Sequence, residues 1–444
     1  MKNKLKIFTV SLGCDKNLVD TEKMLGYLQD NHYELTDTES KADVIIVNTC
    51  AFIRDAKEES IQTILDLSDY KINGNCKALL VTGCLGQRYA KDILEELPEV
   101  DGILGTNDYN HLTQAIKNAI NQEKPVFTTG ITEHHPQLDA RVISAPGHSA
   151  YLKIAEGCDK HCTYCIIPSM RGAYRSFPIE ALIREAQKLI SNGVKELILV
   201  AQETTLYGTD LYGKKQIGVL LDQLNQLDGL EWIRILYCYP EEIDDEFIDA
   251  IKRNSKVCHY LDMPIQHASN HVLKRMGRKT NKEELISTIQ KIRTQIPDIC
   301  LRTTIICGFP GETQSDHDEL LEFLNQMEFD RLGVFEYSPE EGTPAAEYEN
   351  QISFELASLW KDEVMELSEA IVFEKNEQFC GQELRVMVEG KVADENAYIC
   401  RTYRDAPEID GYTFFHSDQE FMTGDFVNVR ITAGYDYDMI GELL

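Results

Sequence analysis

The chain has 444 residues, with 44 Lys and Arg against 74 Asp and Glu, so its formal net charge is −30 at pH 7. Hydrophobic residues make up 43% and charged residues 27%, which excludes disordered and collagen-like classes. At roughly 100–200 residues per domain, the length predicts two to four domains. The negative charge argues against broad, sequence-independent binding of nucleic acid and favours a basic partner.

The 13 cysteines indicate the setting in which the protein works. An odd number cannot pair completely in internal disulfides, and so many thiols favour a reducing compartment, where cysteines serve metals or catalysis. Residues 1–10 predict a first strand and not a signal peptide, because their apolar stretch is very short. No long apolar run occurs, so no membrane-spanning helix is predicted. We therefore expect a cytoplasmic protein with no membrane partner.

The first third of the chain alternates between strand and helix patterns. Apolar runs predict three buried strands, at residues 7–12, 44–47 and 78–81. Helical periodicity follows each run, at residues 19–29, 56–67 and 89–97. Buried strands joined by helices are typical of a parallel sheet covered on both faces. We expect a doubly wound α/β domain over residues 1–122, then a linker over 123–143 whose most polar stretch is 132–139.

The alternation restarts near residue 151. It predicts six strands, at residues 151–155, 196–201, 232–237, 260–264, 301–307 and 331–337. Amphipathic helices lie between most of them, for example at residues 178–191, 283–295 and 316–327. Six β/α units with right-handed crossovers curl into a barrel or a partial barrel. We expect this core domain to span residues 144–375 and to end in a long helix that begins near residue 353.

The end of the chain changes to period-two patterning. It predicts short strands at residues 384–388, 397–400, 412–415 and 426–431, with glycines at the turns. This pattern is typical of a small antiparallel barrel or sandwich. We place this domain at residues 376–444, so the whole chain is a multidomain α/β protein with a terminal β-barrel.

A CxxxCxxC motif follows the first predicted strand of the core domain and consists of Cys158, Cys162 and Cys165. Three thiolates on one loop can hold three irons of a [4Fe–4S] cluster and leave the fourth iron open for a small ligand. A structural zinc site wants a fourth protein ligand, and His161 is too close in sequence to serve comfortably. The motif therefore favours an iron–sulfur cluster over a zinc knuckle or incidental cysteines.

A second set of cysteines lies in the first domain. Cys14, Cys50 and Cys84 each follow one of its predicted parallel strands. Ligands of an open α/β sheet bind outside these strand ends, so the three thiols can converge although they are far apart in sequence. The alternative is three buried packing cysteines. Cys76 is an internal control, because it precedes its strand and should lie at the opposite end.

The motif on a six-unit β/α barrel resembles the radical S-adenosylmethionine (SAM) superfamily. The resemblance implies that the open iron binds SAM and that one electron from the cluster cleaves it to a 5′-deoxyadenosyl radical. It also implies that Gln202 and Glu203 bind the SAM amino group, and that Tyr164 lies beside the adenine. The segment with Ile306 and Gly308 would pack on the adenine, where glycine lets backbone approach a ligand closely.

With its first domain and its terminal barrel, the chain resembles the methylthiotransferase family over nearly its whole length. The resemblance implies that Cys14, Cys50 and Cys84 hold a second [4Fe–4S] cluster, which delivers sulfur. It implies a TRAM domain with an OB-like fold at the C-terminus, and no catalytic residue beyond the cluster ligands. Seven cysteines then remain as expected packing residues: Cys76, Cys238, Cys258, Cys300, Cys307, Cys380 and Cys400.

The family divides between enzymes of tRNA adenosines and a branch that modifies an aspartate of the twelfth protein of the small ribosomal subunit. Residues 201–208, 236–240 and 261–268 resemble the second branch. Residues 380–444 carry five basic and thirteen acidic side chains, which disfavours direct tRNA binding and suits a basic ribosomal protein. The implied reaction methylthiolates the β-carbon of that aspartate and needs an electron donor such as flavodoxin or ferredoxin.

Two alternatives stay open from the sequence. A tRNA adenosine methylthiotransferase would share the same domains and clusters. A non-catalytic iron–sulfur or zinc binding module on the ribosome would keep the cysteines without the chemistry.

Overall fold

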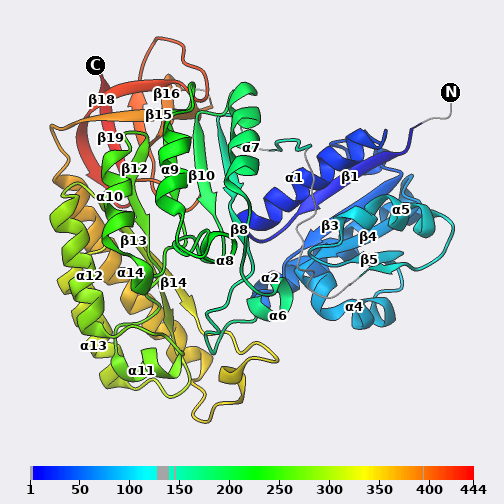
Figure 1. Ribbon diagram of the computed structural model, residues 1–444, viewed down its shortest axis with the longest axis horizontal. Coiled ribbons are helices and arrows are strands. Elements are labelled where there is room, and N and C mark those ends of the chain that lie inside the picture. The colour runs from blue at the N-terminus through cyan, green and yellow to red at the C-terminus, as the bar shows by residue number, and fades with distance from the viewer. Residues whose placement is uncertain (1–3, 128–139, 145–146, 394) are drawn as a thin grey trace.

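The computed structural model describes residues 4–127, 140–144, 147–393 and 395–444. Figure 1 shows an N-terminal α/β domain in blue and cyan beside a larger α/β core domain in green to orange. A small barrel in orange and red lies at the end of the core domain. The most polar part of the expected linker, residues 132–139, lies outside the described residues.

The N-terminal domain is built on a parallel sheet with the strand order β2-β1-β3-β4-β5-β6. Its strands are β1 (Lys6–Ser11), β2 (Glu34–Leu35), β3 (Val44–Thr49), β4 (Ala78–Gly83), β5 (Gly102–Leu104) and β6 (Val126–Phe127). β1, β3 and β4 are the three strands predicted from the sequence. The remaining three have only two or three residues each, too few for a recognisable pattern.

Helices cover both faces of this sheet. Alternate residues of β3 point to opposite faces, so Ile46 packs with α1 (Asp15–Asp30) and α5 (Leu112–Ile120), whereas Ile45 packs with α2 (Arg54–Ser68) and α4 (Cys84–Glu96). The domain is therefore doubly wound, as the sequence predicts.

The core domain has six parallel strands in the order β14-β13-β12-β11-β10-β7. They are β7 (Ser149–Lys153), β10 (Glu196–Val200), β11 (Trp232–Ile235), β12 (Val257–Asp262), β13 (Cys300–Cys307) and β14 (Arg331–Glu336). The sheet ends at β7 and β14, so the six units form a partial barrel. Its main outer helices are α7 (Ile179–Ser191), α9 (Ile217–Asn225), α10 (Asp245–Arg253), α12 (Lys282–Gln295) and α13 (Gln314–Met327).

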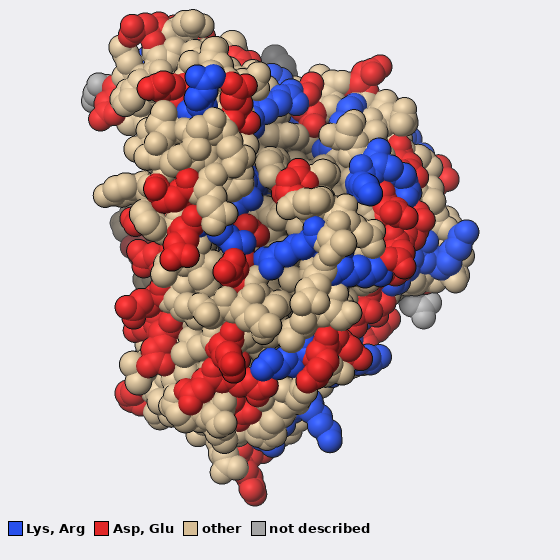
Figure 2. Space-filling view, turned by 90° about the vertical axis from the view of Figure 1, so that its left-hand side faces the viewer, with Lys and Arg blue, Asp and Glu red and all other residues tan. Residues whose placement is uncertain are grey.

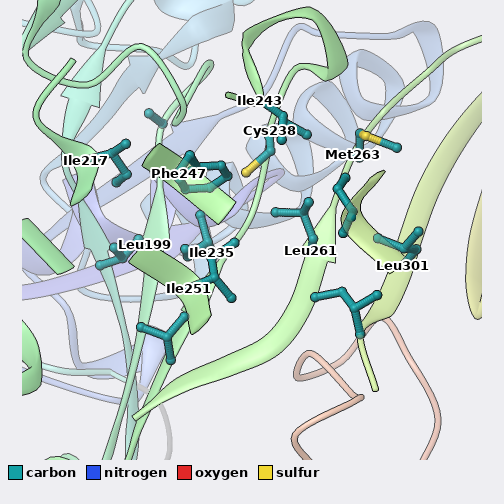
Figure 3. Close-up of a cluster of buried hydrophobic side chains, with 14 of the residues drawn as sticks. Leu199, Ile217, Ile235, Cys238, Ile243, Phe247, Ile251, Leu261, Met263 and Leu301 are labelled. Atoms are coloured by element: carbon teal, nitrogen blue, oxygen red, sulfur yellow. The ribbon is translucent and has the colours of Figure 1, made fainter. Parts of the chain in front are cut away.

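Apolar side chains fill the space between these strands and helices. Figure 3 shows Leu199 and Ile235 of the sheet against Phe247 and Ile251 of α10, with Cys238 among them. The shorter elements of the chain are α3 (Tyr70–Asn73), β8 (Ala155–Glu156), α6 (Ile167–Arg171), β9 (Arg175–Ser176), α8 (Thr209–Tyr212) and α11 (Asn270–Arg275).

The long helix α14 (Phe354–Glu377) contacts both β14 of the core domain and β18 of the terminal barrel. The barrel is closed, with the strand order β15-β16-β17-β19-β18. Its strands are β15 (Glu383–Lys391), β16 (Ala397–Thr402), β17 (Thr413–His416), β18 (Phe426–Tyr435) and β19 (Asp438–Leu443). Four of these five were predicted from period-two patterning. Among the described residues, no helix has the length and apolar character needed to cross a membrane.

The N-terminal and core domains share one hydrophobic cluster. Ile166 directly precedes α6 of the core domain, and Met170 lies within it. Both are buried against Val81 of the N-terminal sheet and Leu85 of its helix α4. The Thr106 hydroxyl of the N-terminal domain donates to the Met170 carbonyl at 3.0 Å. A short helix of one domain therefore completes the core of the other.

Candidate active site

Cys14, Cys50 and Cys84 gather at the carboxyl edge of the N-terminal sheet. Cys14 precedes α1, Cys50 follows β3, and Cys84 is the first residue of α4. Cys14 and Cys84 both lie close enough to the Cys50 thiol for their charges to raise its pKa. The backbone at Gly13 has a φ of 86°, and a Cβ there would lie 2.5 Å from the Cys50 Cβ. The parallel strands thus bring together three thiols that are far apart in sequence.

The surroundings of these thiols suit metal ligands. All three are free cysteines. Burial raises the pKa of Cys50 to about 12, and the neighbouring Cys84 thiol adds to the effect. Burial also raises the pKa of Cys84, against the opposing charge of Arg171. Burial disfavours the thiolates, so the fit to an iron–sulfur cluster rests on the convergence of three free thiols whose protons a metal would displace.

Cys76 lies apart from this set, as its position before β4 predicts. Its thiol donates to the Ala78 carbonyl, and its charged neighbours are Lys71 and Asp101.

The core motif folds into a compact loop after β8. The amide of Cys165 donates to the Cys162 carbonyl at 3.0 Å. Cys158 and Cys162 both lie close enough to the Cys165 thiol for their charges to raise its pKa. Burial raises the pKa of Cys158 to about 11 and that of Cys165 to about 12. His161 is exposed. This loop therefore offers three thiols and no further ligand from His161.

Within the described residues, no three His, Cys, Asp or Glu side chains lie close enough to hold a single metal ion. A tetrahedral zinc site would need such a convergence of ligands on one ion. The irons of a [4Fe–4S] cluster each take one thiolate, so its cysteines stand farther apart. Each cysteine set offers three thiols, one ligand fewer than a tetrahedral zinc site takes from the protein.

Gln202 and Glu203 follow β10 and are buried beside the core motif. The Gln202 amide donates to Glu156 at 2.9 Å, and one Glu203 oxygen accepts from the Thr205 amide at 2.9 Å. The single side-chain oxygen of Gln202 and the other carboxylate oxygen of Glu203 are buried and have no hydrogen-bond partner among the described residues, although the Lys160 ammonium lies 3.8 Å from the Glu203 oxygen. Burial raises the pKa of Glu203 to about 7. Two orphaned acceptor oxygens fit the N–H groups of a bound amine such as that of SAM.

Tyr164 and Ile306 belong to one apolar cluster at the other side of the core motif, where Phe309 is fully buried. The rings of Tyr164 and Phe309 meet edge to face, with centroids 6.4 Å apart. The structure thus brings together two of the residues expected beside the adenine.

The structure shows a packing reason for glycine at position 308. Its φ is 78°, and a Cβ there would lie 2.3 Å from the Cβ of Ala357 in α14. The close approach that the sequence analysis assigned to a ligand is therefore made by this helix. A role of the Gly308 backbone in binding SAM stays a prediction.

A buried network of charges between the two α/β domains has no counterpart in the sequence analysis. Arg171 pairs with Asp20 at 2.7 Å and with Glu156 at 3.1 Å, and Lys153 contacts the same two carboxylates. Asp20 lies in α1, more than a hundred residues before its partners. No local pattern could have indicated this pairing.

The cysteines outside the two sets are packing residues with one exception. Cys238 and Cys307 are fully buried in the main core cluster, as expected, although Cys307 adjoins the segment expected to pack on the adenine. Cys258, Cys300 and Cys400 are also buried, as is Cys76. Cys380 is exposed, so the prediction that it packs in a core is wrong. It lies at the end of α14, where the chain passes to the barrel over a surface turn.

Family profiles match three parts of the chain in the order of its domains. Residues 6–105 match the Uncharacterized protein family UPF0004, residues 152–324 the Radical SAM superfamily and residues 380–444 the TRAM domain. Fold, cysteine geometry and these matches define a radical SAM enzyme with an additional cysteine-bearing α/β domain. Such an enzyme uses SAM together with a [4Fe–4S] cluster.

Relatives called "Ribosomal protein uS12 methylthiotransferase RimO" match the chain over nearly its full length. The protein of Lachnoclostridium phytofermentans is 56% identical over 437 residues, which cover 98% of this chain and 99% of the relative. Those of Clostridium perfringens and Desulforamulus reducens are 50% and 47% identical and also cover at least 98% of both chains. The chain therefore belongs to the RimO family of radical SAM methylthiotransferases.

Solved structures of more distant proteins share the fold. The radical SAM methyltransferase TsrM from Kitasatospora setae has a TM-score of 0.54 at 14% identity, over 77% of each chain. The cobalamin-dependent SAM radical enzyme OxsB has a TM-score of 0.54 at 13% identity, over 83% of this chain and 56% of that chain. At such low identity the likeness concerns the fold alone.

Proposed function

We propose that this enzyme adds a methylthio group to the β-carbon of an aspartate in ribosomal protein uS12. In this proposal it holds two [4Fe–4S] clusters, one at Cys14, Cys50 and Cys84 and one at Cys158, Cys162 and Cys165. The observation that carries the proposal is the presence of two separate sets of three free thiols, each set close to strand ends, in which only Cys14 is exposed. The names of the relatives support uS12 as the substrate.

Each group of residues has a distinct task in this proposal. When bound, the core cluster would supply the electron that cleaves SAM, and the N-terminal cluster would supply the sulfur. The free oxygens of Gln202 and Glu203 accept N–H groups of the SAM amine. The apolar cluster with Tyr164 and Ile306 packs against the adenine. Gln202 and Glu203 are buried and Tyr164 and Ile306 are partly buried, so the proposed SAM site is shielded from much of the solvent.

The charge of the protein supports a basic protein substrate over tRNA. The net charge is −30, and Figure 2 shows acidic side chains from the barrel at the top to the lower end of one face, with Lys and Arg among them across its middle. Such a surface repels phosphates and attracts Lys/Arg-rich proteins. We propose that a flavodoxin or ferredoxin supplies the electron, since the reaction needs a low-potential donor.

One experiment tests the proposal against its alternatives. Anaerobically reconstituted enzyme is incubated with SAM, a reductant and either uS12 or an anticodon stem–loop of tRNA. We expect the mass of an added methylthio group on uS12 alone, and about eight irons per chain. Modification of the tRNA would favour the tRNA adenosine enzyme. Stoichiometric zinc without turnover would favour a binding module and overturn the proposal.

A further inference from the structure

Arg171 of the core domain reaches the cysteine set of the N-terminal domain. It ends α6, six residues after Cys165, and its guanidinium nitrogen lies 3.6 Å from the Cys84 Sγ. The same nitrogen donates to the Asn17 side chain at 2.5 Å. Ile166 and Met170 fix α6 in the N-terminal core, so the guanidinium is held in this place by packing.

The charges around Arg171 are balanced without any thiolate. Asp20 and Glu156 contribute two negative charges, and Arg171 and Lys153 contribute two positive charges. All four residues are almost fully buried. One guanidinium nitrogen binds both carboxylates, and the other is directed to Asn17 and Cys84. The planar guanidinium of arginine can bind the carboxylates with one nitrogen and Asn17 and Cys84 with the other, which a single lysine ammonium cannot reproduce.

We propose that Arg171 is a positioning residue of the N-terminal cluster, which hydrogen-bonds the Cys84 sulfur and raises the reduction potential of that cluster. The inference rests on the proposed cluster at Cys14, Cys50 and Cys84. Reduction adds negative charge to the cluster, so a guanidinium hydrogen bond to a ligand sulfur favours the reduced state even where two carboxylates balance the guanidinium charge. The core domain thereby tunes a cluster that is bound by the other domain.

Turnover is a poor readout for this proposal. Glu156, which pairs with Arg171, also accepts a hydrogen bond from Gln202 at 2.9 Å. Any change at Arg171 can therefore reach the proposed SAM site through one intermediate side chain. The reduction potential of the N-terminal cluster is a more direct measure, because it responds to hydrogen bonding at the Cys84 sulfur, and a control variant shows how far the loss of a structural contact between the domains changes it.

The test isolates the N-terminal cluster in a full-length parent variant that carries Cys158→Ala, Cys162→Ala and Cys165→Ala. Iron counting should find about four irons per chain in this parent. A redox titration followed by electron paramagnetic resonance then compares Arg171→Gln, Arg171→Lys and Arg88→Gln in the same background. Arg88 is the matched control, because it also joins the two domains, through Glu340 at 2.8 Å, and its described hydrogen bonds go to oxygen atoms.

We expect a lower potential for Arg171→Gln, a smaller decrease for Arg171→Lys, and no change for Arg88→Gln. A parent-like potential in Arg171→Gln with full iron content would overturn the proposal. If Arg171→Gln does not retain iron, Arg171→Lys decides the matter in the same way. Absence of iron in the parent itself would instead overturn the proposed N-terminal cluster, and the parent measurement identifies that case before any variant is compared.

Discussion

The Glu196 carboxylate of β10 accepts a hydrogen bond from the Arg401 guanidinium of β16 at 2.6 Å, so a buried ion pair joins the core domain to the terminal barrel. Arg234 of β11 binds the other oxygen at 2.9 Å. Burial alone would raise the pKa of Glu196, but the two guanidinium groups outweigh it and lower the pKa to about 2. The barrel is therefore docked through a charge that must stay ionised.

Glu196→Gln should destabilise the chain by about 3–5 kcal/mol at pH 7, because two arginines lose their buried partner. The folded-state pKa lies below the ordinary value of 4.5, so the ionised carboxylate stabilises the fold above pH 4.5. That contribution is lost as the pH falls toward 2, and the difference between the two proteins should shrink there. Urea unfolding at a series of pH values measures both effects.

Glu231→Gln is the matched control for this prediction. Glu231 also pairs with an arginine of the barrel, Arg385, but both side chains are more than a third exposed. An exposed pair contributes about 0–1 kcal/mol. Equal losses in the two variants would show that the burial of Glu196 has no special effect.

Gly13→Ala should prevent assembly of the N-terminal cluster. The new Cβ would lie 2.5 Å from the Cys50 Cβ, and the φ of 86° adds backbone strain. Gly213→Ala separates the two causes, since its φ is 72° and its Cβ would have no neighbour within 4 Å. Both variants should lose about 1–2 kcal/mol of stability from strain. Only Gly13→Ala should bind about four irons in place of about eight; full iron content would contradict the prediction.

Cys158→Ala should abolish formation of 5′-deoxyadenosine, whereas Cys84→Ala should stop sulfur insertion and leave some SAM cleavage. Each change removes one thiolate ligand of a different proposed cluster. Chromatography of the nucleoside product and mass spectrometry of uS12 measure the two activities separately. Cys380→Ala controls for the loss of a cysteine as such, because Cys380 is exposed and far from both sets in the sequence. Normal SAM cleavage in Cys158→Ala would refute the assignment of the core cluster.

Charge reversal on the barrel should weaken binding of uS12. Glu408 and Asp418 are exposed acidic residues of the barrel domain, so Glu408→Lys and Asp418→Lys should raise KM several-fold and leave kcat unchanged. Wild-type KM should rise with ionic strength for the same reason. Glu96→Lys makes the same change of charge on the N-terminal domain and should have a smaller effect. Equal effects of all three reversals would indicate a general response to net charge.

Patterns within short stretches of sequence were enough to predict most of the architecture. The apolar runs before Cys14, Cys50 and Cys84 fix three parallel strands, and strand direction alone places their ends on one edge. The same argument placed Cys76 elsewhere, and the structure agrees. The period of the hydrophobic pattern and the position of a residue relative to its strand therefore indicate which side chains meet, even when they are far apart in the sequence.

Other features depend on contacts that no pattern encodes. Asp20 and Arg171 are single charged residues in amphipathic segments, and only tertiary packing pairs them. Gly308 has the same signature whether a ligand or the α14 helix lies against it. Nothing in the sequence distinguishes Cys380 from the packing cysteines, but the turn after α14 places it at the surface. The surroundings of these side chains could therefore be known only from the structure.

The burial of Ile166 and Met170 within the N-terminal domain has a consequence for biosynthesis. A chain is made from its N-terminus, so the sheet of the first domain emerges from the ribosome before α6 exists. Its hydrophobic core stays incomplete until residue 170 has been translated. The first domain therefore completes its hydrophobic core only after the segment that carries Cys158, Cys162 and Cys165 has been made.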